Sequence, residues 1–362
     1  MSTEKMTPHL SKKIKVLSFY CILLVLYIHT YYNEGEKYES CMFLVSLFGQ
    51  GISYIAVPLF YLISGYLFFL GTESKPINVV FGKQKKRIRT LLVPYLIANA
   101  LNLLFYLMLP CVARYIPAIQ PLIAHNLLES AGNGWVDKLS FSFYSGPIAF
   151  QLWFVRDLMV LVILSPLLYY ILRFACRSKL GCILLLCLLS PLAYFRPTAF
   201  LWAMGWFCIG GLIVMNPYIS ITNCCKWKPL GILSIVLCFC FVLVNALSCI
   251  GLIDFWVRPA WIIVPGIIGI WIIYDCLLGK SKQIDVLLLN FRIYGYTFFL
   301  YLIHEPFMNI FKKLPLLVSN TEMVIDICYL TVPVIFAVLA MFVGIAFQRS
   351  FPKFYSTFTG GR

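Results

Sequence analysis

Six ionisable side chains lie within or at the ends of apolar segments, where such groups are rare. They are two histidines, two arginines and two carboxylates: His29, Arg156, Asp157, Arg258, His304 and Glu305. Ionisable groups at membrane depth are expensive and usually face a protein interior or a water-filled path. Histidines and carboxylates exchange protons and arginines attract negative charge, so this set predicts a site that handles protons or anions. Each residue alone also has a structural interpretation, as a packing ion pair or as a satisfied interior histidine.

The composition indicates whether these residues lie in a soluble domain or in a membrane. Apolar residues make up 61% of the chain and charged residues 12%, with a mean hydropathy of +0.88. Soluble domains are about 45–50% apolar and about 25% charged. The sequence therefore predicts an integral membrane protein, with helices and not a barrel, because the apolar runs are continuous and do not alternate.

About ten apolar runs are long enough to be membrane-spanning helices, which need roughly 20 residues. The predicted all-α spans are 14–32, 45–71, 90–110, 152–172, 181–195, 198–215, 230–249, 260–278, 293–311 and 324–347. The segments predicted to lie on the same side of the membrane as the N-terminus hold 21 of the 29 Lys and Arg residues. The positive-inside rule then predicts a multi-pass protein of the cell (inner) membrane with both termini cytoplasmic.

Three segments outside the spans complete this predicted topology. Residues 1–13 and 348–362 are expected to be cytoplasmic tails, and 111–150 an extracytoplasmic loop with room for a short amphipathic helix. That loop could cap a cavity, contact a large acceptor or simply connect two spans.

Several other classes of site are disfavoured. The net charge of +15 comes from basic residues next to predicted spans and not from a separate basic domain, so it predicts contact with anionic lipids and not with nucleic acid. Most of the 14 cysteines lie in apolar runs, with no CxxC pair and no zinc-ligand spacing, so no metal site is expected. The oligomeric state is not encoded in these patterns, because contacts between copies resemble those within one copy.

The first predicted span carries polar residues along one face. Ser18 and His29 are eleven residues apart, which is three helical turns plus about 20° and about 16 Å along the axis. Ile22 and Val25 continue the same stripe. One helix face is therefore predicted to connect the cytoplasmic mouth of a cavity to the imidazole of His29.

Five motifs in order resemble one family. They are VLYIHTYY around His29, VPLFYLISGYLFF at 57–69, KKRIRTLLVPYLIAN at 85–99, LWFVRDL at 152–158 and YLIHEPF at 301–307. The chain resembles the acyltransferase 3 family of integral membrane enzymes over nearly its whole length. The resemblance implies a single membrane-embedded domain over 1–362. It also implies transfer of an acyl group, commonly acetyl, from cytoplasmic acyl-coenzyme A to a sugar hydroxyl of a cell-surface or exported glycan.

The sequence departs from the family pattern at one position. Family members commonly carry Arg or Lys where this chain has Ser18, with ten residues before the first-span histidine. Serine cannot replace that charge. Lys15 lies one turn closer to the cytoplasm and about 60° around the helix, and its flexible stem could bring an ammonium to the same region. The alternatives are a different mode of coenzyme A binding or a less active member.

The resemblance assigns roles to the residues of the opening set. His29 is the expected general base, and Glu305 or Asp157 is expected to orient it or an acceptor hydroxyl. Arg156 or His304 would stabilise the negative charge that develops on a thioester oxygen.

The donor, acyl-coenzyme A, carries phosphates that need cations. Those expected to serve are Lys15, Lys85, Lys86, Arg87 and Arg89. The basic run 82–89 has an alternative interpretation as an anchor for anionic lipid. The acceptor would be a glycan or lipid-linked sugar. Without an evident fused extracytoplasmic domain, transfer is expected to be direct or to need a separate partner.

Two alternatives from other classes remain at this point. A transporter of glycan precursors or organic anions could use His29, His304 and Glu305 as a proton relay, although paired half-structures are not evident. An inactive relative acting as an assembly subunit is the other. Trp202 and Trp206, four residues apart, are expected to fill the core, with stacking on a sugar as the alternative.

Overall fold

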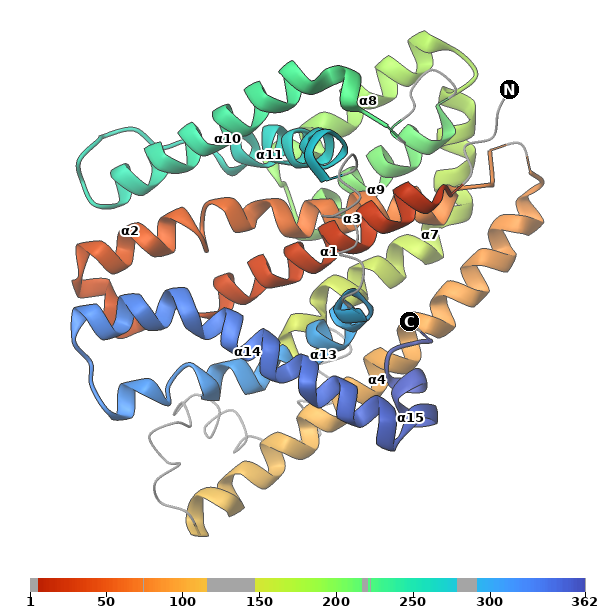
Figure 1. Ribbon diagram of the computed structural model, residues 1–362. Coiled ribbons are helices and arrows are strands. Elements are labelled where there is room, and N and C mark those ends of the chain that lie inside the picture. The colour runs from red at the N-terminus through yellow and green to blue at the C-terminus, as the bar shows by residue number, and fades with distance from the viewer. Residues whose placement is uncertain are drawn as a thin grey trace.

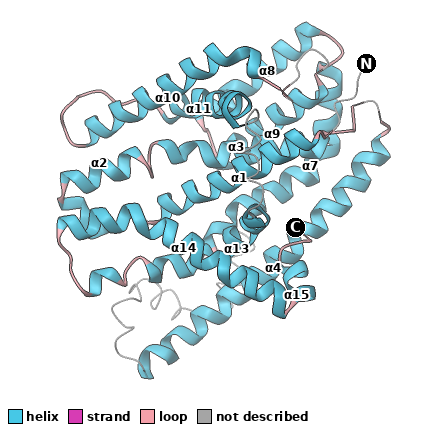
Figure 2. Cartoon of the chain, viewed as in Figure 1, coloured by secondary structure: helices cyan, strands magenta, loops and turns pink. Residues whose placement is uncertain are grey.

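The computed structural model describes residues 6–73, 75–115, 147–216, 221, 223–278 and 292–361. Within these ranges the chain is helical and contains no strand (Figure 2). The predicted all-α class is therefore confirmed for the described residues. Most of the predicted loop 111–150, including residues 116–146, lies outside them.

The helices follow the apolar runs of the sequence. In chain order they are α1 (Pro8–His29), α2 (Glu39–Leu47), α3 (Ala56–Phe69), α4 (Ile77–Tyr115), α7 (Trp153–Ala175), α8 (Lys179–Phe195), α9 (Ala199–Met215), α10 (Lys228–Cys249), α11 (Pro259–Ile273), α13 (Thr297–Phe311), α14 (Glu322–Ser350) and α15 (Pro352–Phe358). Each of the ten predicted ranges overlaps at least one of these helices.

Six helical stretches of the described chain are long and apolar enough to cross a membrane. They are Glu39–Phe69, Ile77–Phe105, Phe150–Ala175, Cys225–Cys249, Pro259–Cys276 and Glu322–Ser350. Helices α8 and α9 are apolar but have only 17 residues each. The count of about ten spans and the cytoplasmic location of both termini stay predictions.

Some boundaries differ from the predicted ones. The second predicted span is interrupted: α2 ends at Leu47, and a 3-10 turn over Ile52–Ile55 precedes α3. Gly49 and Gly51 lie in the interruption, where glycine weakens a helix. Helix α4 begins 13 residues before the predicted span and takes the basic run 82–89 into the helix, because Lys and Arg are good helix formers and no proline interrupts them.

The predicted C-terminal tail is partly folded. Residues 352–358 form the short helix α15, and its Tyr355 and Phe358 are buried in a small cluster with Tyr296 and Phe299. The tail therefore packs against the bundle and does not extend away from it.

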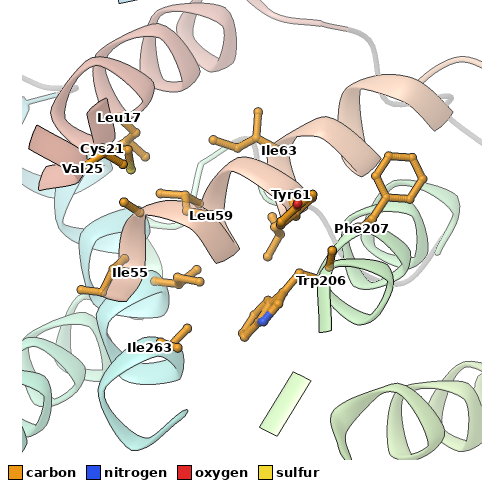
Figure 3. Packing of buried hydrophobic residues seen from close by; sticks show 14 of the residues in the cluster. Leu17, Cys21, Val25, Ile55, Leu59, Tyr61, Ile63, Trp206, Phe207 and Ile263 are labelled. Atoms are coloured by element: carbon orange, nitrogen blue, oxygen red, sulfur yellow. The ribbon is translucent and has the colours of Figure 1, made fainter. Parts of the chain in front are cut away.

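Helix α3 lies at the centre of the bundle. Figure 3 shows its Leu59, Tyr61 and Ile63 between side chains of α1 on one side and those of α9 on the other. Figure 1 shows α1 alongside α3, with α4 as a long helix at the edge of the molecule. The buried positions of α1, α3 and α9 thus form one continuous core.

Helices α3 and α9 approach closely because glycines face each other's backbone. A methyl group on Gly65 would meet the carbonyl oxygen of Phe207, and one on Gly210 would meet the carbonyl oxygen of Leu62. Small residues permit this kind of backbone contact between membrane helices. The contact fixes α3 against α9, and so fixes the wall that α3 presents to α1.

The start of α1 is held by a buried charge cluster. Lys13 Nζ donates to Asp275 Oδ2 at 2.8 Å, and His9 Nε2 lies 2.8 Å from Asp275 Oδ1. The Cys224 amide also donates to Asp275 Oδ2, at 2.7 Å, and the Lys13 ammonium lies 4.1 Å from the centre of the Trp271 ring. Lys13 is fully buried. Such a pair is tolerated because its charges are satisfied on several sides.

The other end of α1 is capped by Lys312, the residue that directly follows α13. Lys312 Nζ donates to the carbonyl oxygen of His29 at 3.0 Å, where the helix dipole favours a cation. Helix α1 is therefore fixed at both ends. In Figure 1, α2 and α14 extend past its C-terminal end. The His29 side chain there is half-buried.

Candidate active site

A cavity of about 740 Å³ runs beside α1, between α3, α4, α7 and α13. Lys15, Ser18, Val25 and His29 of α1 all line it, so the predicted polar face does face one cavity. Ile22, the other member of the predicted stripe, is buried in the core instead. His29 is fourteen positions after Lys15, which places them about 21 Å apart along the helix axis.

His29 contacts a carboxylate at one end of this cavity. Its Nδ1 lies 3.1 Å from Glu305 Oε1, and the other Glu305 oxygen accepts from Asn309 Nδ2 at 2.5 Å. Nδ1–H donating to a carboxylate leaves Nε2 of the neutral ring as the proton acceptor. The arrangement therefore suits a histidine base oriented by an acid.

Glu305 reaches His29 because α13 is broken at this residue. Its backbone is extended (φ −107°, ψ 135°), and the following Pro306 has no N–H to donate to the carbonyl oxygen of Leu302. Gln151 replaces the missing donor: its Nε2 donates to Leu302 O at 3.2 Å and to Glu305 O at 2.8 Å. Tyr301 in turn donates its hydroxyl to Gln151 O at 2.5 Å.

His304 packs on His29 from the neighbouring position of α13. The two rings lie 4.9 Å apart, nearly edge to face, and His304 is fully buried. Its Nδ1 lies 2.7 Å from the carbonyl oxygen of Tyr301, which requires the proton on Nδ1. Nε2 has no hydrogen-bond partner among the described residues, so the neutral ring presents a lone pair there and donates only if it gains a second proton.

Arg156 and Asp157 pair with each other. Arg156 Nε and Nη2 lie 3.0 and 2.9 Å from Asp157 Oδ1, and Asp157 is buried. Neither residue lines the cavity, whereas their neighbours Phe154, Val155 and Leu158 do. This ion pair therefore lies outside the cavity lining, and its packing role stays a prediction. Arg258 is exposed at the start of α11 and also does not line the cavity.

Only some of the cations predicted to bind the acyl-coenzyme A donor line the cavity. Lys15 and Arg87 line the cavity, at the end away from His29. Lys85, Lys86 and Arg89 are exposed and are absent from its lining. Because Arg87 and Arg89 are two residues apart on one helix, they point in nearly opposite directions.

Several residues at the site were not predicted from the sequence. Gln151, Asn309 and Lys312 each hold His29 or Glu305 in place. Asn309 follows Glu305 by four residues, a helical spacing that could have identified it. Gln151 and Lys312 carried no comparable signal, because their partners are distant in the sequence.

The site is thus a histidine–carboxylate pair at one end of a cationic cavity in a bundle of apolar helices. Comparison with known families assigns the chain. Residues 12–347 match a family described as an acyltransferase domain, and the chain belongs to this acyltransferase 3 family. Because the described residues include six helical stretches long and apolar enough to span a membrane, it is a multi-pass membrane protein.

One curated relative is the succinoglycan biosynthesis protein ExoH of Rhizobium meliloti (strain 1021). It is 26% identical over 175 residues, which is 45% of this chain and 43% of the relative. The chain therefore matches less than half the length of that relative. No solved structure matches this chain.

Proposed function

We propose that this protein is a membrane O-acyltransferase that moves an acyl group, acetyl in the simplest case, from cytoplasmic acyl-coenzyme A to a sugar hydroxyl of a cell-surface or exported polysaccharide. The observation that carries this proposal is one cavity with Lys15 and Arg87 toward one end and His29 at the other. The family supports acyl transfer, and the name of the relative, a succinoglycan biosynthesis protein, supports a polysaccharide acceptor.

The cations of the cavity would bind the acyl-coenzyme A donor. The phosphates of coenzyme A would lie against Lys15 and Arg87, since clustered cations bind phosphate strongly. The pantetheine arm would then extend along the α1 face past Ser18 toward His29, over a distance of about 21 Å. Lys15 takes the place of the basic residue that this chain lacks at position 18.

The histidine–carboxylate pair accounts for the chemistry. His29 Nε2 would take the proton of the sugar hydroxyl as the oxygen attacks the thioester carbon. The tetrahedral intermediate would collapse by breaking the carbon–sulfur bond, and His29 would return the proton to the leaving thiolate. The products are an ester and free coenzyme A. Glu305 holds the ring and stabilises the imidazolium form.

The charge on the intermediate needs a second group. Arg156 and His304 are proposed for this role, and each carries a condition set by the geometry. Arg156 would have to reach past the cavity wall from its pair with Asp157, and His304 would have to be protonated on Nε2. A neutral His304 would instead act by packing against His29.

The test uses purified protein in detergent with labelled acetyl-coenzyme A. We expect release of labelled acetate or transfer to added saccharide in the wild type, and a fall of about 10²–10⁴-fold in His29→Ala. His9→Ala is the matched control, because His9 contacts Asp275 and does not line the cavity. It should retain wild-type activity.

Other outcomes identify the alternatives. Equal thioester turnover in the wild type and in His29→Ala would contradict the proposed base. Saccharide flux across vesicles that requires His29 but no acyl-coenzyme A would indicate the transporter. Absence of both activities in folded protein would indicate an assembly subunit.

A further inference from the structure

Arg196 has a backbone conformation that few non-glycine residues adopt. It follows α8 with a φ of +49°, and it is the one non-glycine residue with positive φ in the described ranges. Glycine is the usual residue at this position after a helix. In addition, Pro197 follows, and a residue before proline prefers extended backbone. Residues held in such conformations cluster at binding sites.

The side chain of Arg196 lies in the cavity without a counter-charge. Its guanidinium carbon lies 4.9 Å from the centre of the Trp202 ring. Among the described residues none forms a hydrogen bond or ion pair with it, and yet it lines the same cavity as His29. Trp202 itself is buried, so the guanidinium rests on a fixed ring. Its five donors therefore remain available to a ligand.

The charges around the cavity have one sign. Lys15, Arg87 and Arg196 line it, and no aspartate or glutamate does so among the described residues. The surrounding wall is apolar and includes the aromatic rings of Phe60, Phe150, Trp153, Phe154 and Tyr301. A cationic cavity with aromatic walls suits a ligand that carries both negative charge and flat apolar faces, as an acidic sugar does.

Arg196 lies toward the same end of the cavity as His29, away from Lys15. Helix α7 begins at Trp153, close to Gln151 and therefore to Glu305, and α8 turns back after only three residues. The end of α8 thus returns toward the level of Trp153 and His29. Lys15 lies about 21 Å from His29 along α1, so the phosphates that it would bind cannot also occupy Arg196. A second anionic group, distinct from the phosphates at Lys15, would account for Arg196 in this cavity.

We propose that Arg196, backed by Trp202, binds a carboxylate or other anionic substituent of the acceptor saccharide and so selects acidic glycans. This inference rests on the proposed function and adds the acceptor class. Arginine donates two parallel hydrogen bonds to a carboxylate, while aromatic rings stack on the sugar face. Arg196 is exposed, which leaves it accessible from the side from which an acceptor would enter.

The test compares two sugars that differ at one carbon. Methyl β-D-glucuronoside carries a carboxylate, and methyl β-D-glucoside carries a neutral hydroxymethyl group at that place. Binding to the full chain in detergent is measured by saturation-transfer NMR, with coenzyme A present. We expect the wild type to bind the glucuronoside at least about tenfold more tightly, and Arg196→Gln to lose this preference while its affinity for coenzyme A is unchanged.

Controls separate charge from folding. Arg258→Gln removes an exposed arginine at another helix boundary and should keep the preference. Arg196→Lys should keep part of it. The methyl ester of the glucuronoside, tested on the wild type, should bind like the glucoside, which gives an answer even if Arg196→Gln does not fold.

The outcomes are distinguishable from those of the proposed function, because binding needs no catalysis. Equal affinity of the wild type for both sugars, or a preference retained in Arg196→Gln, would overturn the inference even if His29-dependent transfer is observed. If Arg196→Gln loses affinity only for coenzyme A thioesters whose acyl group ends in a carboxylate, Arg196 binds the acyl group and not the acceptor. That result would also overturn the inference.

Discussion

At the scale of residues, the proposed chemistry depends on which nitrogen of His29 carries the proton. Glu305 lies 3.1 Å from Nδ1, so in the proposed chemistry its carboxylate holds the proton there and leaves Nε2 to act as the base. Asn309 donates to the Glu305 carboxylate, and the side-chain amide of Gln151 donates to the Glu305 backbone carbonyl. With both its carboxylate and its backbone held, Glu305 can orient the ring with little freedom.

Replacing Glu305 with Gln keeps the size of the side chain and removes its charge. We expect kcat to fall by about 10²-fold or more, because the amide stabilises the imidazolium poorly and permits the wrong tautomer. The KM for acetyl-coenzyme A should change little, since Glu305 does not line the cavity. Steady-state kinetics of thioester turnover measures both constants.

Glu322→Gln is the matched control for this substitution. Glu322 is exposed at the start of α14, contacts Ser40 and is absent from the cavity lining. Its kcat should equal that of the wild type. An unchanged kcat in Glu305→Gln would remove the orienting role of Glu305.

At the scale of elements, the basic residues of α4 lie on different faces of the helix. Arg87 lines the cavity and Arg89 is exposed. We expect Arg87→Gln to raise the KM for acetyl-coenzyme A by roughly tenfold or more, because the substitution removes one charge-assisted hydrogen bond to the donor. Arg89→Gln should leave it within about twofold. Equal effects of the two substitutions would show that the cluster acts on lipid or through its net charge.

The α3–α9 contact predicts that replacing glycine with alanine has opposite effects on stability at two positions. Gly65→Ala would force a methyl group against the carbonyl oxygen of Phe207 and should lower the free energy of unfolding by about 1–3 kcal/mol. Gly82→Ala, on α4, meets no atom within 4 Å and should be neutral or stabilising by about 0.5–1 kcal/mol. Thermal unfolding in detergent compares the two. A stabilising effect at Gly65 would mean that the helices are not in close contact.

These elements also show how far the sequence determines the structure. Apolar run length predicted the positions of the helices, and the eleven-residue spacing placed Ser18 and His29 on one cavity. The break at Glu305 and the support from Gln151 were not predictable, because they depend on contacts between α13 and the start of α7. Arg196 was not predicted either, since neither its conformation nor its place in the cavity is visible in an apolar pattern.

At the scale of the whole molecule, the distribution of Lys and Arg predicts that both termini are cytoplasmic. Donor access depends on this orientation, because Lys15 and Arg87 must lie at the cytoplasmic end of the cavity. Epitope tags at each terminus should resist protease added to intact spheroplasts and become sensitive when inverted vesicles are used. Cleavage of either tag in intact spheroplasts would reverse the assigned orientation of that end.

The whole account depends on one passage joining the donor cations to His29. The most direct measurement is a cryo-EM difference map of the protein with a non-hydrolysable acyl-coenzyme A analogue. We predict that the phosphates contact Lys15 and Arg87, with the acyl carbon within reach of His29 Nε2. Density for the analogue outside this cavity, or an acyl group that ends away from His29, would contradict the account.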